Sequence, residues 1–407
     1  MDRVVPGRDP TRSGVITPLT DRSQSVSEWI PGSANIPGDV NDVYLDHAAT
    51  TPMRPEVREA MEPYLAGSYG NPSGSHGVSR RAKNALEEAR ERVAVVLGCA
   101  PQEIVFTAGG TEADNLAVKG AALSEGIGGV VTVATEHEAV LESAEFIRRM
   151  GGGVAVVGVD SIGRVDPDGV LAAVTPETRV VSVMWANNET GTLQPLSEIS
   201  ALLDGRTLLH TDAVQAFISE DVTVDGIDLL SLAGHKFGGP KGVGVLYVRD
   251  GVRLEPVLHG GGQELGRRSG THNVAGAVGF AAAVEATVAD RSMFRDRVGA
   301  IRARFEELVV DIARRTVPSE HSLVQHAHLR LAGQRNETML VRLDQRGVAA
   351  SSASACQSGA NTISHVLAAM GVDEPREYLR FSFGWNSTLE DAERAAEAVR
   401  IAAGVPA

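Results

Sequence analysis

The segment SLAGHKFGGPKGVGVLYV (231–248) decides the fold, because it joins two apolar runs through a glycine-rich turn that contains Lys236. The runs on either side, LLSLAG (229–234) and GVLYV (244–248), are short and continuous, which is typical of strands covered on both faces. A lysine at the end of such a strand can reach a bound ligand and act as an amine nucleophile. A surface lysine in a turn would give the same pattern, so this segment alone leaves both interpretations open.

Further apolar runs of this kind precede the segment and alternate with helical patterns such as the one between Ala82 and Val96. This alternation predicts an α/β fold with a mostly parallel central sheet, whose ligands bind at the carboxyl ends of the strands. The runs are Ile104-Val105-Phe106, VVTVA (130–134), VAVVGV (154–159), VVSVMW (180–185) and TLLHTD (207–212).

The pattern changes after an Ala-rich helix expected near 274–288, and strand-like HAHLRL (326–331) and YLRFSF then alternate with helices. We expect a mobile N-terminal extension over 1–42 and a segment over 43–58 that joins the small domain. A large α/β domain over 59–290 and a small α+β domain over 291–407 follow.

Composition argues against a nucleic-acid-binding protein and against a membrane-spanning one. The 407 residues carry a net charge of -14, which argues against nucleic acid as a direct partner, and no apolar run reaches the roughly 18 residues of a membrane span. Only Cys99 and Cys356 occur, so no disulfide framework is expected and a reducing cytoplasm fits best. The first forty residues lack the apolar core of a signal peptide.

Two other segments carry candidate ligands. In FTAGGTEADN (106–115), Gly110 and Thr111 open a helix after a strand, where backbone N–H groups and a hydroxyl can bind phosphate. In TDAVQ (211–215), Asp212 ends an apolar run and could pair with a ring nitrogen. A Gly-Gly turn is more often a plain strand-to-helix connection, and Asp212 could equally be a helix cap.

Cys356 lies in SSASACQSGA (351–360), a run of small residues that could form a flexible loop. A thiolate that carries sulfur from a substrate to an acceptor needs such a loop, although a buried structural cysteine is the alternative. Cys99, in LGCAPQE, lies between a helix and a strand and is interpreted as structural.

Taken together, these segments resemble the cysteine desulfurases, a family of the class V aminotransferase superfamily of fold-type I pyridoxal-phosphate enzymes. The resemblance spans about residues 43–400. It also rests on YLDHAATTP (44–52), NPSGSH (71–76), TEHEAV (135–140), NNETGTLQP (187–195), GHKFGGPKGVG (234–244), GGGQELGRRSGTHNVAG (260–276) and LRFSFGWNST (379–388).

The resemblance implies roles for the residues around the cofactor ring. Lys236 would form a Schiff base with pyridoxal 5'-phosphate, Asp212 would face the pyridine nitrogen, and Gln215 would bond the phenolic oxygen. His137 would stack over the ring and shuttle protons.

The resemblance also implies a phosphate site and a partner subunit. Gly110, Thr111 and His235 would bind the phosphate, joined by Thr271 from a second subunit, which makes the enzyme a homodimer. No metal ligands are implied.

Asn188 and Arg380 would hold L-cysteine, and Cys356 would take its sulfur as a persulfide, release L-alanine and pass the sulfur to an acceptor protein. The Cys356 segment resembles the longer-loop branch, which is associated with iron–sulfur cluster assembly and tRNA thiolation. Without the resemblance, structural roles would be favoured: Arg380 as a half-buried ion-pair partner, and His137, His235 and Asn188 as hydrogen-bonded structural residues.

Several positions depart from the family pattern. Ala233 stands where many members have a phosphate-binding serine, Ala353 replaces a common glycine, and Trp385 replaces an arginine at the entrance. His47 and His272 occupy variable positions.

Rival functions are a selenocysteine lyase, another class V aminotransferase, and a catalytically idle sulfur-carrier scaffold. A dinucleotide-binding oxidoreductase is disfavoured, because no Gly-x-Gly-x-x-Gly turn follows the first strand.

Overall fold

The computed structural model describes residues 42–203, 205–352 and 363–406, and these described residues form one unit. All but the last residue of the predicted extension over 1–42 lies outside the described residues. The principal helices are α1 (Pro55–Leu65), α2 (Gly77–Leu97), α3 (Gly110–Leu123), α4 (Glu138–Arg149), α5 (Pro167–Ala173), α6 (Leu196–Leu202), α7 (Val274–Leu308), α8 (Asn336–Asp344), α9 (His365–Ala369) and α10 (Leu389–Ala402).

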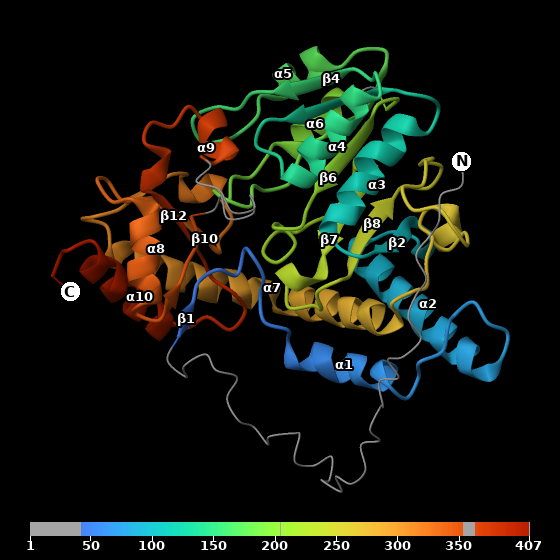
Figure 1. The fold of residues 1–407 in the computed structure, drawn as a ribbon, viewed down its shortest axis with the longest axis horizontal. Coiled ribbons are helices and arrows are strands. Elements are labelled where there is room, and N and C mark those ends of the chain that lie inside the picture. The colour runs from blue at the N-terminus through green and yellow to red at the C-terminus, as the bar shows by residue number, and fades with distance from the viewer. Residues whose placement is uncertain (1–41, 204, 353–362, 407) are drawn as a thin grey trace, which may run out of the picture. The chain divides into compact units, whose positions relative to one another are not determined.

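A seven-stranded sheet, in the order β2-β8-β7-β6-β5-β3-β4, lies at the centre of the first part of the chain (Figure 1). The strands from β7 to β4 run parallel, whereas β8 is antiparallel to both β7 and β2. Each predicted apolar run forms one strand, so the predicted α/β fold with a mostly parallel sheet is confirmed. The strands are β2 (Ile104–Thr107), β3 (Gly129–Val133), β4 (Val154–Val157), β5 (Thr178–Ser182), β6 (Leu208–Asp212), β7 (Leu229–Ala233) and β8 (Gly244–Val248).

Helices cover both faces of this sheet, because successive side chains of a strand point to opposite faces. Leu229 of β7 packs in a buried cluster with α3 and α4, whereas Leu230 packs in a second cluster with α2 and α7. Ser231 and Ala233 share the face of Leu229, and on the neighbouring strand Asp212 is paired with Ser231. The ends of β6 and β7 therefore present Asp212 and Ala233 beside α3.

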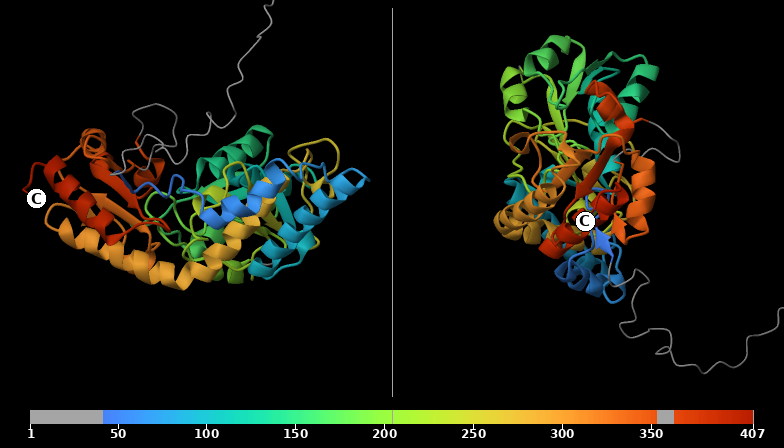
Figure 2. Two further views of the ribbon diagram at one scale, coloured as in Figure 1. Left: turned by 90° about the horizontal axis from the view of Figure 1, so that it is seen from below. Right: turned by 90° about the vertical axis from the view of Figure 1, so that its left-hand side faces the viewer.

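Helix α7 continues to Leu308 instead of ending near residue 288 as predicted. Buried Phe294, Val298, Ile301 and Phe305 recur every three or four residues and give the polar second half an apolar face. The helix contacts α1, α2 and α10, and Figure 2 shows it running past both the large sheet and the C-terminal strands. The predicted domain boundary at residue 290 falls within this helix, and the division into two domains stays a prediction.

The C-terminal part contains a three-stranded antiparallel sheet in the order β12-β10-β9, with β9 (Arg314–Arg315), β10 (His326–Arg330) and β12 (Tyr378–Ser382). The N-terminal strand β1 (Val43–Tyr44) pairs in parallel with β11 (Val348–Ala349). In the described part of the chain, no helix is both long and apolar enough to cross a membrane.

The residues that follow β1 connect the two sheets. Leu45 O accepts from Ser382 N of β12 at 2.7 Å, and Thr51 N donates to His235 O, just after β7, at 3.0 Å. Segment 45–54 therefore runs from the C-terminal sheet to the turn that contains Lys236.

Candidate active site

Lys236 lies at the carboxyl end of the large sheet, in the short 3-10 turn Gly234–Lys236 that follows β7. Its Nζ donates to Ala48 O at 2.6 Å and to Ala49 O at 2.9 Å. Gln215 Nε2 donates to the same Ala48 O at 2.9 Å. Segment 45–54 therefore brings two of the predicted cofactor residues together.

Asp212 is the last residue of β6 and is 7% exposed. Burial raises the pKa of its carboxyl group, while His137, the hydrogen bond from Val214 N at 2.8 Å and Lys236 act in the opposite direction. A buried carboxylate of this kind stays ionised most readily when a cation lies against it. Asp212 is therefore suited to pairing with a protonated ring nitrogen.

His137 caps the N-terminus of α4, where its Nδ1 accepts from Ala139 N at 3.1 Å. Burial lowers the pKa of this imidazole, and the nearby Asp212 counteracts the shift. A neutral ring that accepts at Nδ1 carries its proton on Nε2. His137 can therefore donate a proton or a hydrogen bond from Nε2.

A buried polar layer to which the sequence analysis gave no role lies behind Asp212. His210 bonds Ser182 Oγ through Nδ1 at 2.8 Å and Ser231 Oγ through Nε2 at 3.0 Å, and its Nε2 lies 3.7 Å from Asp114 Oδ1. Burial lowers the pKa of His210 to about 3 and raises that of Asp114 well above its usual range. Burial therefore disfavours the charged forms of both His210 and Asp114 in this layer.

We expect His210→Gln to make the apoprotein less sensitive to acid. The folded-state pKa of about 3 lies below the unfolded value of about 6.5, so between these values only the unfolded chain binds the proton, and stability falls as pH decreases. The substitution should flatten urea unfolding free energy against pH by about 1.4 kcal/mol per pH unit between pH 6 and 4. Exposed His259, changed in the same way, is the control. Equal slopes for wild type and His210→Gln would contradict the expectation.

The predicted phosphate turn has the geometry of an anion site. Gly109 has a φ of 153°, which favours glycine, and Gly110 begins α3. A Cβ on Gly110 would lie 3.1 Å from Val214 Cγ2 and 3.4 Å from Ala233 Cβ, so only a glycine leaves this turn undisturbed. The N–H groups at the start of α3 open towards a cavity of about 760 Å³, which Thr111 also lines.

His235 lines the same cavity, and its Nδ1 lies 3.2 Å from Thr50 Oγ1. Burial, with smaller contributions from Lys236 and Lys241, lowers the pKa of His235 to about 4. Thr271 is exposed on the loop before α7 and is not among the described residues that line this cavity. The structure thus groups Thr111 with His235 and leaves Thr271 apart from them.

Arg380 of β12 is 3% exposed and is held from two sides. Its Nη1 donates to Asn188 O at 2.8 Å, and its Nη2 donates to Asp46 Oδ1 at 2.6 Å. Arg380 Nε has no hydrogen-bond partner among the described residues. A substrate carboxylate would therefore meet a guanidinium group that is already fixed in orientation.

Cys356 and Ala353 lie outside the described residues, but both flanks of their segment reach the site. Ser351 N donates to Arg380 O at 3.1 Å, and Arg380 N donates to Ser351 O at 2.8 Å. On the other flank, His365 Nε2 lies 2.9 Å from the backbone oxygen of Glu136, the neighbour of His137 in the chain.

The structure adds residues that the sequence analysis did not assign, above all Asp46, Thr50 and the carbonyl groups of Ala48 and Ala49. The signal was the polar segment YLDHAATTP directly after a strand. Trp385 also has a defined environment, since its Nε1 donates to Pro52 O at 2.9 Å and the Arg54 guanidinium lies 5.3 Å from its ring centre. Among the described residues, no group of three or more His, Cys, Asp or Glu side chains could hold a metal ion.

Comparisons with known proteins identify the family of this chain. The aminotransferase class-V family model matches residues 43–395. The chain is 41% identical over 361 residues to cysteine desulfurase IscS of Dictyoglomus turgidum, covering 86% of this chain and 91% of that protein. Among solved structures, a NifS-like protein superposes with a TM-score of 0.83 at 35% identity, covering 88% of this chain and 98% of the other.

A second structure, described as SspA in complex with cysteine, has a TM-score of 0.75 and 36% identity and covers 84% of this chain and 98% of the other. The chain therefore belongs to the class V aminotransferase family and, within it, to the cysteine desulfurases.

Proposed function

We propose that this desulfurase uses pyridoxal 5'-phosphate and Cys356 to convert L-cysteine to L-alanine, and that it works as a homodimer with an acceptor protein for the sulfur. The main support is that Lys236 and Gln215 both donate hydrogen bonds to Ala48 O at the carboxyl end of the large sheet. Asp212 and His137 lie close enough to Lys236 to influence one another's pKa.

The residues present fit a planar aldehyde that bears a phosphate. Gly110, Thr111 and His235 line a cavity at the N-terminus of α3, where a phosphate would meet partial positive charge. Lys236 offers a primary amine, and Asp212 offers a buried carboxylate for a ring nitrogen. When bound, the cofactor would supply an electron sink that makes the substrate α-proton acidic.

Three residues of the chain would then have separate roles in the reaction. The Lys236 amine would accept the proton from the substrate Cα, and Arg380 would orient the substrate carboxylate. The Cys356 thiolate would attack the substrate sulfur, so that an S–S bond forms as the substrate C–S bond breaks. One proton would then complete the methyl group at Cβ, and Lys236 would return a proton to Cα to give L-alanine. The balanced products are one Cys356 persulfide and one L-alanine for each L-cysteine.

The test is a product balance. With L-cysteine, a thiol reductant and added cofactor, purified protein should release L-alanine and sulfide in equal amounts. L-selenocysteine in parallel reactions separates the rival lyase. Alanine from L-selenocysteine alone would exclude the proposal, and incorporation of an amino group into an added keto acid would favour an aminotransferase.

Acceptor transfer needs a separate measurement. Protein loaded with labelled sulfur from L-cysteine should pass the label to a protein in host lysate, whereas Cys356→Ser protein treated in parallel should not. Label that reaches lysate proteins equally from both would indicate free sulfide instead of direct transfer.

We expect Ala233→Ser to tighten cofactor binding about tenfold. Residue 233 is 2% exposed and faces the turn at Gly110, so a hydroxyl there could donate to a phosphate. Such charge-assisted bonds contribute about 1.5 to 3 kcal/mol, and existing donors should offset part of this. Cofactor dissociation constants measure the effect. Saturated turnover should barely change, because the phosphate is bound equally in ground and transition states. An unchanged constant would mean that residue 233 does not face the phosphate.

A further inference from the structure

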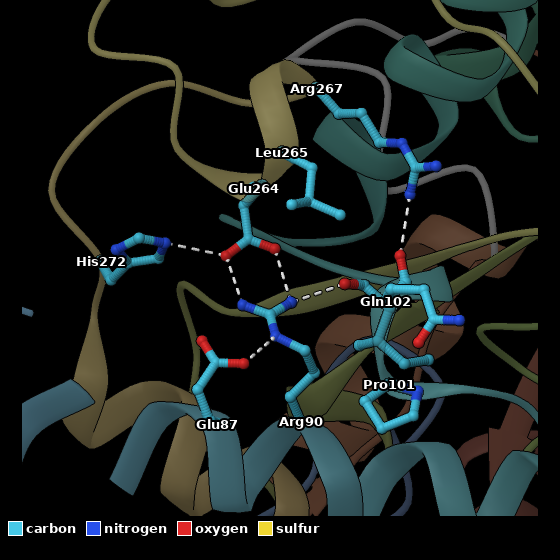
Figure 3. A pocket seen from close by; sticks show the side chains of 9 residues that line it. Glu87, Arg90, Pro101, Gln102, Glu264, Leu265, Arg267 and His272 are labelled. Carbon is cyan, nitrogen blue, oxygen red and sulfur yellow. Dashed lines mark hydrogen bonds and ion pairs between the residues drawn. The ribbon is translucent and has the colours of Figure 1, made fainter. Parts of the chain in front are cut away.

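The loop between β8 and α7 is anchored by one buried carboxylate. Glu264 accepts from Arg90 Nη1 at 2.7 Å and from Arg90 Nη2 at 2.8 Å, in a two-pronged ion pair with α2 (Figure 3). It also accepts from Phe106 N of β2 at 3.0 Å and lies 2.9 Å from His272 Nε2. Glu264 thus ties the loop to α2, to β2 and to the residue next to Thr271.

This anchor is charged and shielded from water. The Glu264 side chain is 1% exposed and that of Arg90 is 9% exposed. Burial raises the pKa of Glu264, but hydrogen bonds from His272 and Arg90 outweigh it and lower the pKa to about 2. A buried pair with this geometry holds its partners in one arrangement, because separation would leave an unpaired charge.

The backbone at the anchor is unusual. Glu264 has a φ of 51° and Leu265 a φ of 57°, both in the left-handed region that disfavours residues other than glycine. Such strain persists only where surrounding contacts fix it, and it concentrates at functional sites. Leu265 is 75% exposed and lines the same pocket as Glu264 and Arg90 (Figure 3).

A second ion pair ties the same loop to the start of α3. Arg268 Nε donates to Glu112 Oε1 at 2.7 Å, and Glu112 Oε2 accepts from Ala108 N at 2.8 Å. The loop is therefore fixed on both sides of the phosphate turn of its own chain, through Phe106 and through Ala108 and Glu112. Thr271, next to the anchored His272, nevertheless remains exposed outside that chain's cavity.

We propose that Glu264 is a positioning residue that fixes Thr271 for the cofactor phosphate of a second copy of the chain. The inference rests on the proposed homodimer and cofactor. Glu264 contacts His272 directly, and Thr271 is the residue before His272, so the position of the exposed Thr271 depends on the anchor. Glu264, Arg90 and His272 thus form a rigid base from which Thr271 reaches outwards.

Mixed dimers with one competent lysine test this inference. In the first, a Lys236→Ala chain pairs with a Glu264→Gln chain, so the intact Lys236 receives Thr271 from a loop with native Glu264. In the second, wild type pairs with a Lys236→Ala/Glu264→Gln chain, so the intact Lys236 receives Thr271 from the altered loop. The readout is the dissociation constant for pyridoxal phosphate at the intact lysine, compared with a wild-type/Lys236→Ala dimer.

We expect pyridoxal phosphate to bind about tenfold more weakly in the second dimer, because the loss of one charge-assisted hydrogen bond has an effect of this size. In the first dimer the dissociation constant should change by less than about twofold. Weakening in the first dimer alone would show that Glu264 serves its own subunit. Equal weakening in both, or in neither, would also overturn the inference.

Control substitutions distinguish a misplaced Thr271 from a general loss of stability and from failure of the proposed function. Glu285→Gln removes a similar two-pronged pair between α7 and Arg92 of α2, at 2.8 and 2.6 Å, outside the loop, and should leave binding unchanged in both dimers. Thr271→Ala in place of Glu264→Gln should reproduce the second-dimer effect, and the double variant should add little. If Glu264→Gln chains do not fold, His272→Ala replaces it.

Hydrogen exchange over residues 259–273 of apoprotein should rise in Glu264→Gln but not in Glu285→Gln. Failure of tagged chains to form mixed dimers would overturn the homodimer together with this inference. A wild-type dimer that attaches no cofactor would instead refute the proposed cofactor lysine.

Discussion

Replacing Lys236 with alanine is expected to abolish turnover and the visible absorbance of covalently attached cofactor, while the protein stays folded. The substitution removes both the amine that attaches the cofactor and the group proposed to move the α-proton, and proton transfer alone contributes about 10² to 10⁴-fold in rate. We therefore expect a loss of at least about 10³-fold. The fold should survive because Gln215 still bonds Ala48 O and segment 45–54 keeps its backbone bonds to Ser382 and His235.

Two variants make the measurement specific to the amine. Lys236→Arg keeps a positive charge that can donate to Ala48 O, but a guanidinium group forms no stable Schiff base, so it should be as inactive as alanine. Exposed Lys83→Ala on α2 should retain wild-type activity. Sulfide release at the wild-type rate from purified Lys236→Ala protein would refute the assignment of the cofactor lysine.

The strands of the large sheet could be predicted because each is a short run of buried apolar residues bounded by turns. The end of α7 could not, because its second half is polar and its four buried apolar side chains gain their contacts only in the folded chain. The course of segment 45–54 was also inaccessible. It depends on pairing between Val43 and Val348, which lie far apart in the sequence.

The features of the candidate site fall into the same two groups, those that could be predicted from the sequence and those that could not. Motifs predict roles for Lys236, Asp212 and Arg380 because the residue types and their order in the chain are visible in the sequence. The ion pair between Asp46 and Arg380 spans 334 positions, and the carbonyl groups that hold Lys236 have no side-chain signal at all. Sequence thus predicts which residues react, while the contacts that orient them depend on the tertiary fold.

The chain contains only two cysteines, Cys99 and Cys356, so Cys99 serves as an internal control for the proposed role of Cys356. Burial raises the pKa of the Cys99 thiol to about 12, with a further contribution from Glu103. At neutral pH that thiol stays protonated and reacts poorly with sulfur. Cys99 also packs against the hydrophobic core just after the end of α2.

Cys356→Ser protein should bind cofactor and L-cysteine but form no protein persulfide, and its alanine production should fall by at least about 10³-fold, since a serine hydroxyl is a poor nucleophile towards sulfur. The flanks of the Cys356 segment support this role, because Ser351 pairs with Arg380 and His365 bonds the residue before His137.

Mass spectrometry after exposure to L-cysteine should find one added sulfur atom on Cys356 in wild type and in Cys99→Ser, and none in Cys356→Ser. Cys99→Ser should keep turnover within about twofold, as expected for a substitution away from special features. Sulfur found on Cys99 would reverse the roles of the two cysteines, and full alanine production by Cys356→Ser would mean that sulfur leaves the substrate without a protein carrier.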